Sequence, residues 1–342
     1  MMRIPLRLSL FASIVFVAGL SSCKKEIPAP PLVTGLVATA LPPKPVPAFD
    51  AERALRIVDT QVNFGPRVPN SAGHDQEVEW LYSSLQQCTP NVQRQAFTQS
   101  GYDAGEELAL TNIIASFNPS ATWRILIVTH FDSRPFADES PADSSKKQAV
   151  PAANDGGSGT AVMLELARVM KDNPPPIGVD LLFDDGEDYG NYKIDDLTHY
   201  FLGVKYFVKA KASDYNPRYA ILLDMVGDKK ALFQPEGHSL QSAPQLVTEI
   251  WKTAESLGLS HFKSTPGPTI EDDHLPLIDA GIPSVDLIDG DLVGHASPDA
   301  DRKYWHTLDD LPYHLSSQTL GEVGRLLLTL FYDRLPRDIP TL

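Results

Sequence analysis

LLFDDGEDYG, residues 181–190, places two adjacent carboxylates, Glu187 and Asp188, shortly after an apolar run. The apolar residues 179–183 are typical of a buried strand. Because adjacent side chains that leave a strand point in different directions, one carboxylate can bind a metal while its neighbour faces a substrate. This stretch therefore predicts a strand that ends at a chemical site.

Two other segments supply the remaining groups that such a site needs. NDGGSG, residues 154–159, contains Asp155, and YWHT, residues 304–307, contains His306. Two carboxylates and an imidazole form a three-ligand zinc site with one coordination position open, the arrangement of a catalytic zinc. The alternative is that Asp155 only caps the helix after it and that His306 only packs beside Trp305.

Apolar runs and helical patterns alternate along most of the chain. Strands are predicted at 112–117, 125–128, 179–183, 220–225 and 284–288. Helices are predicted at 50–62, 73–87, 160–170, 200–211, 240–257 and 320–332. Strands that alternate with helices indicate a three-layer α/β/α domain with a mainly parallel central sheet.

Acidic and imidazole side chains fall at one predicted edge of this sheet. They are His130, Asp155, Glu187, Asp188, Asp224 and His306. Most lie at or just beyond the carboxyl ends of strands, and the others lie in loops that precede helices. Ligand sites in open α/β sheets form where such loops converge. We therefore expect these side chains to meet.

The N-terminus is predicted to lie outside the fold. Residues 1–22 combine a positively charged start with a short apolar stretch, as in a signal peptide. LSSC, residues 20–23, resembles the lipobox of bacterial lipoproteins, which would make Cys23 the lipidated first residue; the alternative is an ordinary secretory signal. The Pro-rich residues 23–49 would form a tether, and residues 50–335 the catalytic domain. We expect an exported lipoprotein, membrane-anchored and facing the periplasm or the cell exterior.

Charge excludes one class of partner. The net charge of −15 argues against nucleic acid, because phosphate binding needs clustered Lys and Arg. Hydrophobic residues make up 42% of the chain and charged residues 21%, which is ordinary for a globular protein. A monomer is expected.

The motifs together resemble those of the glutaminyl-peptide cyclotransferases (glutaminyl cyclases), especially the bacterial ones, which share a fold with zinc aminopeptidases. The resemblance covers roughly residues 50–335. Its motifs are NFGPR at 63–67, THFDS at 129–133, NDGGSG at 154–159, GEDYG at 186–190, LDMVG at 223–227, EDDH at 271–274 and WHT at 305–307. Their order and spacing carry the resemblance, and no single motif would.

The resemblance implies a role for each matched residue. A single Zn²⁺ would be held by Asp155, Asp188 and His306, with Glu187 as general acid/base. Asp224 and Asp272 match acidic residues that form a hydrogen-bond network with that glutamate, and Trp305 matches an aromatic residue of the substrate pocket. His130 and Asp224 match the ligands of a second zinc in the aminopeptidases.

The implied reaction converts the N-terminal glutamine of peptides or proteins to pyroglutamate and releases ammonia. The first alternative is a two-zinc aminopeptidase that hydrolyses N-terminal residues; the second is a non-catalytic binding protein on the same fold. One departure concerns the pocket, because residues 191–198 lack a tryptophan common in the family. Tyr189 or Tyr192 is expected to take its place.

Overall fold

The computed structural model describes residues 44–102, 105–190 and 197–338. The predicted signal peptide, Cys23 and most of the Pro-rich tether lie outside these residues. Among the residues that it does describe, no helix has the length and apolar character needed to cross a bilayer.

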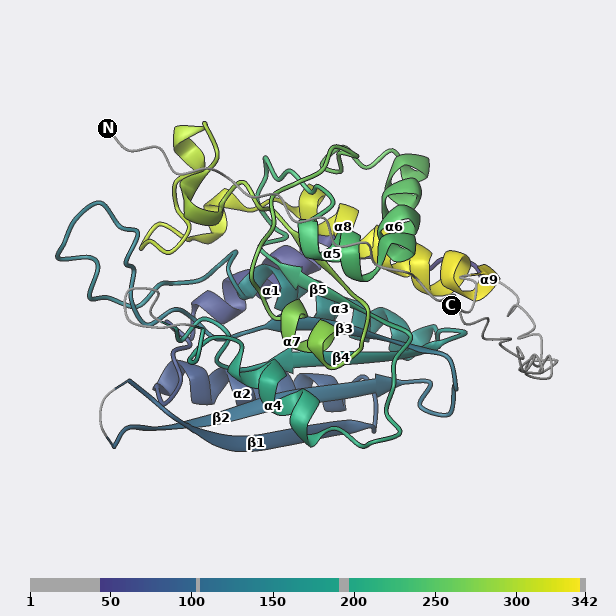
Figure 1. The fold of residues 1–342 in the computed structure, drawn as a ribbon, viewed down its shortest axis with the longest axis horizontal. Coiled ribbons are helices and arrows are strands. Elements are labelled where there is room, and N and C mark those ends of the chain that lie inside the picture. The colour runs from purple at the N-terminus through teal and green to yellow at the C-terminus, as the bar shows by residue number, and fades with distance from the viewer. Residues whose placement is uncertain (1–43, 103–104, 191–196, 339–342) are drawn as a thin grey trace, which may run out of the picture. The chain divides into compact units, whose positions relative to one another are not determined.

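The centre of the fold is a six-stranded sheet in the order β1-β2-β4-β3-β5-β6 (Figure 1). The strands are β1 (Val92–Ser100), β2 (Glu107–Phe117), β3 (Arg124–His130), β4 (Gly178–Asp184), β5 (Tyr219–Asp224) and β6 (Ser284–Ile288). Strands β4, β3, β5 and β6 run parallel to one another. Strands β1 and β2 form an antiparallel hairpin, and β2 pairs antiparallel with β4. The predicted mainly parallel sheet is confirmed.

Helices cover both faces of the sheet, which confirms the three layers. The helices are α1 (Ala51–Val62), α2 (Ala72–Gln86), α3 (Gly157–Asp172), α4 (Leu202–Ala210), α5 (Gly237–Ser242), α6 (Pro244–Leu257), α7 (His274–Asp279), α8 (Ser317–Thr329) and α9 (Leu335–Asp338). Alternate residues of β3 point to opposite faces. Ile125 and Ile127 pack in the larger core with α1, α3 and α8, whereas Leu126 and Val128 pack with α4 and α7.

Several elements differ from the sequence prediction. Helix α7 was not predicted, and β2 begins at Glu107 instead of at 112. The helix expected at 240–257 is two helices, because Pro244 begins α6 and Ala243 before it has an extended φ of −137°. Strand β1 was not predicted. Phe97 is its one buried residue, so the segment lacks the apolar pattern that identifies a strand.

Candidate metal centre

The carboxyl ends of three neighbouring parallel strands deliver the predicted side chains to one edge of the sheet. Strand β3 ends at His130, β5 ends at Asp224, and Glu187 lies three residues beyond the end of β4. Asp155 comes from the turn before α3, and His306 from the loop before α8. The expected convergence is confirmed.

Asp155, Asp188 and His306 each offer a ligand atom, and these atoms lie within 4.8 Å of one another. Nε2 of His306 is 3.5 Å from Oδ2 of Asp155 and 3.5 Å from Oδ1 of Asp188. These distances are too long for good hydrogen bonds. They match the roughly 3.3–3.5 Å that separates ligand atoms around a tetrahedral zinc with bonds of about 2.0–2.2 Å. The three donors therefore fit a zinc ion, although their role as ligands stays a prediction.

A second group of three shares Asp155 with the first. It contains His130 and Asp224, again with ligand atoms within 4.8 Å of one another. Nε2 of His130 is 3.1 Å from Oδ1 of Asp155 and 3.3 Å from Oδ1 of Asp224. Because each oxygen of Asp155 faces a different histidine, this carboxylate lies where a bridge between two metal ions would be.

The two histidines have opposite electrostatic surroundings. Burial disfavours the charged form of His130, but the carboxylates of Asp132, Asp155 and Asp224 outweigh it and hold its pKa well above the usual range. Burial, together with the charge of Arg134, lowers the pKa of His306 well below its usual range. His306 is therefore neutral at pH 7, the form in which imidazole binds metals.

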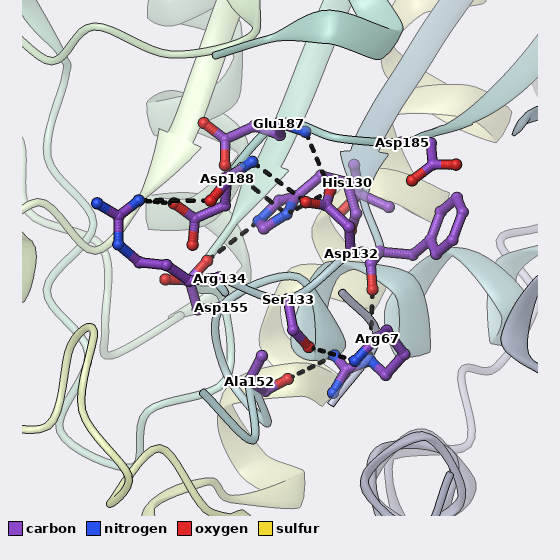
Figure 2. A network of polar contacts seen from close by, with 12 residues as sticks. Arg67, His130, Asp132, Ser133, Arg134, Ala152, Asp155, Asp185, Glu187 and Asp188 are labelled. Carbon is purple, nitrogen blue, oxygen red and sulfur yellow. Dashed lines mark hydrogen bonds and ion pairs between the residues drawn. The ribbon is translucent and has the colours of Figure 1, made fainter. Parts of the chain in front are cut away.

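Asp132 holds the loop that carries Glu187 and Asp188. Its two carboxylate oxygens accept hydrogen bonds from the backbone N–H groups of Glu187 (3.0 Å) and Asp188 (3.2 Å), as Figure 2 shows. Gly186 makes the preceding turn with a φ of +77°, a conformation that favours glycine. The two adjacent carboxylates are thus held in fixed, different directions.

Burial raises the pKa of Glu187 well above its usual range, and the nearby carboxylates of Asp188, Asp272 and Asp132 raise it further against the opposing charge of His130. A carboxyl group whose pKa lies closer to neutrality can both accept and donate a proton. The predicted general acid/base thus has the electrostatic setting that its role requires.

A cavity of about 920 Å³ opens over these residues. Its lining includes Asp155, Glu187, Asp188, Asp224, Asp272, Trp305 and His306, with apolar walls from Tyr200, Phe201, Met225, Ile270, Ile288 and Val293. The half-buried Trp305 stacks on His306, with ring centroids 3.5 Å apart. The predicted pocket residues therefore share one cavity.

One expectation about the pocket needs revision, and a second stays a prediction. Tyr189, proposed in place of the missing tryptophan, packs in a small core with Phe97 and Leu202, and Tyr192 lies outside the described residues. Besides Trp305, the aromatic residues that line the cavity within the described part of the chain are Tyr200 and Phe201.

Among the described residues, no hydrogen bond joins Glu187 to Asp224 or Asp272, so the expected network is not seen. The contact recorded for Asp224 is with His130, whereas Asp272 accepts a hydrogen bond from the backbone of Asp273 (2.6 Å). Asp272 still raises the pKa of Glu187 through its charge. The link to Glu187 is therefore electrostatic in this structure.

Sequence reasoning missed several side chains that hold the site. Asp310 accepts hydrogen bonds from the backbone N–H groups of Asn154 (2.8 Å) and Asp155 (3.1 Å). The buried Arg67 pairs with Glu77 at 2.8 Å and donates to the carbonyl of Ala152 at 2.7 Å (Figure 2). Arg67 and Asp310 therefore fix the turn before α3 from two distant segments. The NFGPR motif contained Arg67, but nothing in its local pattern indicated these partners.

Arg134 and Asp138 were also missed. Arg134 is 1% exposed, and its guanidinium contacts Asp188 as well as Asp138. A spacing of four residues indicates an ion pair only within a helix, and this segment is a loop, so no local pattern connected the two residues to the candidate ligands.

The fold and the two groups of candidate ligands fit a zinc-dependent enzyme of the exopeptidase-like class. Residues 112–331 match peptidase family M28, so the chain belongs to this family. The predicted family resemblance is confirmed, since solved structures similar to this chain include both Zn-dependent exopeptidases and glutaminyl cyclases.

Three relatives illustrate the range. A Zn-dependent exopeptidase from Parabacteroides distasonis is 37% identical, with a TM-score of 0.79 over 84% of this chain and 100% of that chain. The glutaminyl cyclase of Bacteroides thetaiotaomicron, bound to N-acetylhistamine, is 35% identical, with a TM-score of 0.78 over 84% of this chain and 99% of that chain. Aminopeptidase YwaD of Bacillus subtilis is 29% identical to this chain. The aligned part covers 63% of this chain and 42% of that protein.

Proposed function

We propose that this protein is a glutaminyl-peptide cyclotransferase that acts on peptides or proteins with an N-terminal glutamine. The observation that carries the proposal is the position of Glu187, a carboxyl group of raised pKa, in one cavity with the zinc-compatible triad and Trp305. The similarity to bacterial glutaminyl cyclases over most of the chain supports it.

The reaction forms one bond and breaks one. The α-amine nitrogen attacks the side-chain amide carbon, the C–N bond to the amide nitrogen breaks, and ammonia leaves. One proton moves from the attacking amine to the leaving nitrogen. Zinc bound by Asp155, Asp188 and His306 would polarise the amide carbonyl.

The chain's own residues account for the proton and for the geometry. Glu187 takes the proton from the attacking amine and delivers it to the leaving nitrogen, and such catalysis contributes typically 10²–10⁴-fold. The Trp305 indole covers one side of the cavity and restricts the bound glutamine. A ring closure benefits strongly from such orientation, because both reacting groups belong to one molecule.

One observation favours an aminopeptidase instead. His130, Asp155 and Asp224 form a second group of possible ligands, so the site has the donors for two zinc ions. Metal stoichiometry separates the two functions, with one zinc per chain expected of the cyclase.

The direct test incubates the protein with a peptide that begins with glutamine and a matched peptide that begins with leucine. Mass spectrometry distinguishes the loss of ammonia from the removal of a residue. We expect loss of ammonia from the first peptide and no change in the second. Release of free leucine, together with two zinc ions per chain, would establish the aminopeptidase.

A further inference from the structure

Arg134 and Asp138 form an ion pair that lies between two of the candidate zinc ligands, Asp188 and His306. Nη1 of Arg134 lies 2.5 Å from Oδ1 of Asp188, the oxygen that faces His306. Nε and Nη2 of the same guanidinium each lie 2.9 Å from an oxygen of Asp138. Oδ1 of Asp138 in turn lies 3.6 Å from Nδ1 of His306. The path Asp188–Arg134–Asp138–His306 therefore begins and ends at a candidate ligand, and Figure 2 shows its Arg134–Asp188 part.

Nδ1 of His306 is a buried polar atom in need of a partner. It has no hydrogen bond to any of the described residues. If Nε2 binds a metal, Nδ1 carries the ring proton, and ligand histidines almost always donate that proton to a carboxylate, a carbonyl or water. Asp138 faces this atom at a distance only a few tenths of an ångström beyond hydrogen-bond range.

The backbone already holds Asp138 beside His306. The N–H of Glu139 donates a hydrogen bond of 3.2 Å to the carbonyl oxygen of His306. His306 itself has a φ of +52°, uncommon for a residue other than glycine, so its conformation depends on such surrounding contacts.

We propose that Arg134 and Asp138 act together as a positioning pair for zinc. Arg134 directs the Asp188 carboxylate, and Asp138 accepts the Nδ1 proton of His306 and thereby fixes its tautomer and ring orientation. The inference rests on the zinc of the proposed function, but not on which reaction the enzyme catalyses.

The fold contains a matched ion pair away from the site. Arg124 at the start of β3 donates two hydrogen bonds, of 2.6 and 3.0 Å, to the carboxylate of Asp180 in β4. This pair joins β3 and β4 near the strand ends that lie opposite the metal centre. With a half-buried arginine and a buried aspartate, it provides a control for the loss of an arginine–aspartate pair as such.

The experiment compares Asp138→Ala with Asp180→Ala in the otherwise intact protein. Zinc affinity is measured by competition with a chelating dye and without substrate, and folding is monitored by thermal unfolding. We expect Asp138→Ala to weaken zinc binding by about 10–100-fold, the usual effect of losing such an outer partner. Asp180→Ala should change zinc affinity by less than about twofold, whatever its effect on stability. Equal zinc affinities in the two variants would overturn the proposal.

Conservative variants separate positioning from bulk structure. Asp138→Asn keeps an oxygen that can accept the Nδ1 proton, so we expect it to recover part of the lost affinity. Arg134→Lys keeps the charge but cannot contact Asp138 and Asp188 through one planar group, so it should also weaken zinc binding; it replaces Asp138→Ala if that variant does not fold. Wild-type zinc affinity in Arg134→Lys would contradict the proposed pair.

Cobalt supplies a spectroscopic readout of ligand geometry. With Co²⁺ in place of zinc, the visible absorption of Asp138→Ala should shift while that of Asp180→Ala stays unchanged. Identical spectra for wild type and Asp138→Ala would count against the pair. These measurements need no turnover, so a failure of the cyclase proposal, which would appear in the peptide assay on the wild-type protein, is recognised separately.

Discussion

Asp155 directs one carboxylate oxygen to His306 and the other to His130, at 3.5 and 3.1 Å. Its backbone is fixed by Asp310, and the glycine that follows it lies against His130. The position of this one carboxylate therefore depends on the end of β3 and on the loop that carries both His306 and Asp310.

Variants of Glu187 and His306 should lose activity for different reasons. We expect Glu187→Gln to keep zinc bound but to lose most turnover, by about 10²–10⁴-fold, because the amide cannot transfer the proton. His306→Ala should lose metal and activity together, because a ligand is removed. Zinc content and initial rate on both variants test this.

The control for these variants is Glu255→Gln, on the exposed surface of α6, which should behave as wild type. A Glu187→Gln enzyme of near-normal rate would rule out the proposed proton transfer.

Gly156 is needed for its close contacts as well as for its backbone angle. Its φ is +79°, and a Cβ there would lie 2.9 Å from the carbonyl oxygen of Asp132 and 3.0 Å from Cε1 of His130. Gly156→Ala should therefore lower both the free energy of unfolding and the zinc affinity. Gly258→Ala, with a φ of +66° and open space, should cost only the backbone strain of about 1–2 kcal/mol.

Denaturant unfolding and chelator competition on both glycine variants test this difference. Unchanged zinc affinity in Gly156→Ala would show that the contact with His130 does not position the ligands.

The short helix α5 depends on one buried carboxylate. Glu236 accepts hydrogen bonds from the backbone N–H groups of His238 (2.8 Å) and Ser239 (2.7 Å) at the start of the helix. It also accepts one from the N–H of Ile270 (3.1 Å), a residue of the cavity wall. Glu236 therefore connects α5 to the segment that carries Asp272.

The pKa of Glu236 predicts how this connection responds to acid. Burial opposes ionisation, but the contact with His274 at 3.4 Å and the hydrogen bonds from His238 and Ser239 outweigh it and lower the pKa of Glu236 from 4.5 to about 2. A lowered folded-state pKa stabilises the fold above pH 4.5, and this contribution disappears as the pH falls towards 2. Glu236→Gln should therefore cost about 1–3 kcal/mol at pH 6 and less at pH 3.

Unfolding by denaturant at the two pH values measures this difference. A Glu236→Gln penalty that is the same at pH 3 as at pH 6 would show that ionisation of this carboxyl does not stabilise α5.

Taken as a whole, the chain combines an acidic enzyme domain with an N-terminal segment outside the described residues. We expect Cys23→Ser to move the protein from the membrane fraction to the soluble fraction, because acyl chains would no longer hold it. Cys88→Ser, at the half-buried cysteine after α2, should leave the distribution unchanged. Detergent partition and intact mass measure both variants. Equal membrane association of the two would contradict lipidation at Cys23.

Elements with a strong local pattern were predictable. Strand β6 was predicted at its observed bounds, and α1 begins after its predicted cap Asp50, whose side chain accepts a hydrogen bond from the N–H of Arg53. Strand β1 was not, because its polar residues form a strand only by pairing with β2. Local pattern therefore predicts elements that bury a face, and misses those that depend on a neighbour.

The difference between local pattern and long-range contact also separates what the sequence alone determined from what only the tertiary structure decided. The order of strands and helices, the family and the candidate ligands all followed from short motifs, because their spacing is a property of the chain. Other features did not follow from motifs. They are the two overlapping triads around Asp155, the path from Asp188 through Arg134 and Asp138 to His306, and the support from Asp310 and Arg67. Each joins residues far apart in sequence whose contact depends on loops meeting at the end of the sheet, and no local pattern records that meeting.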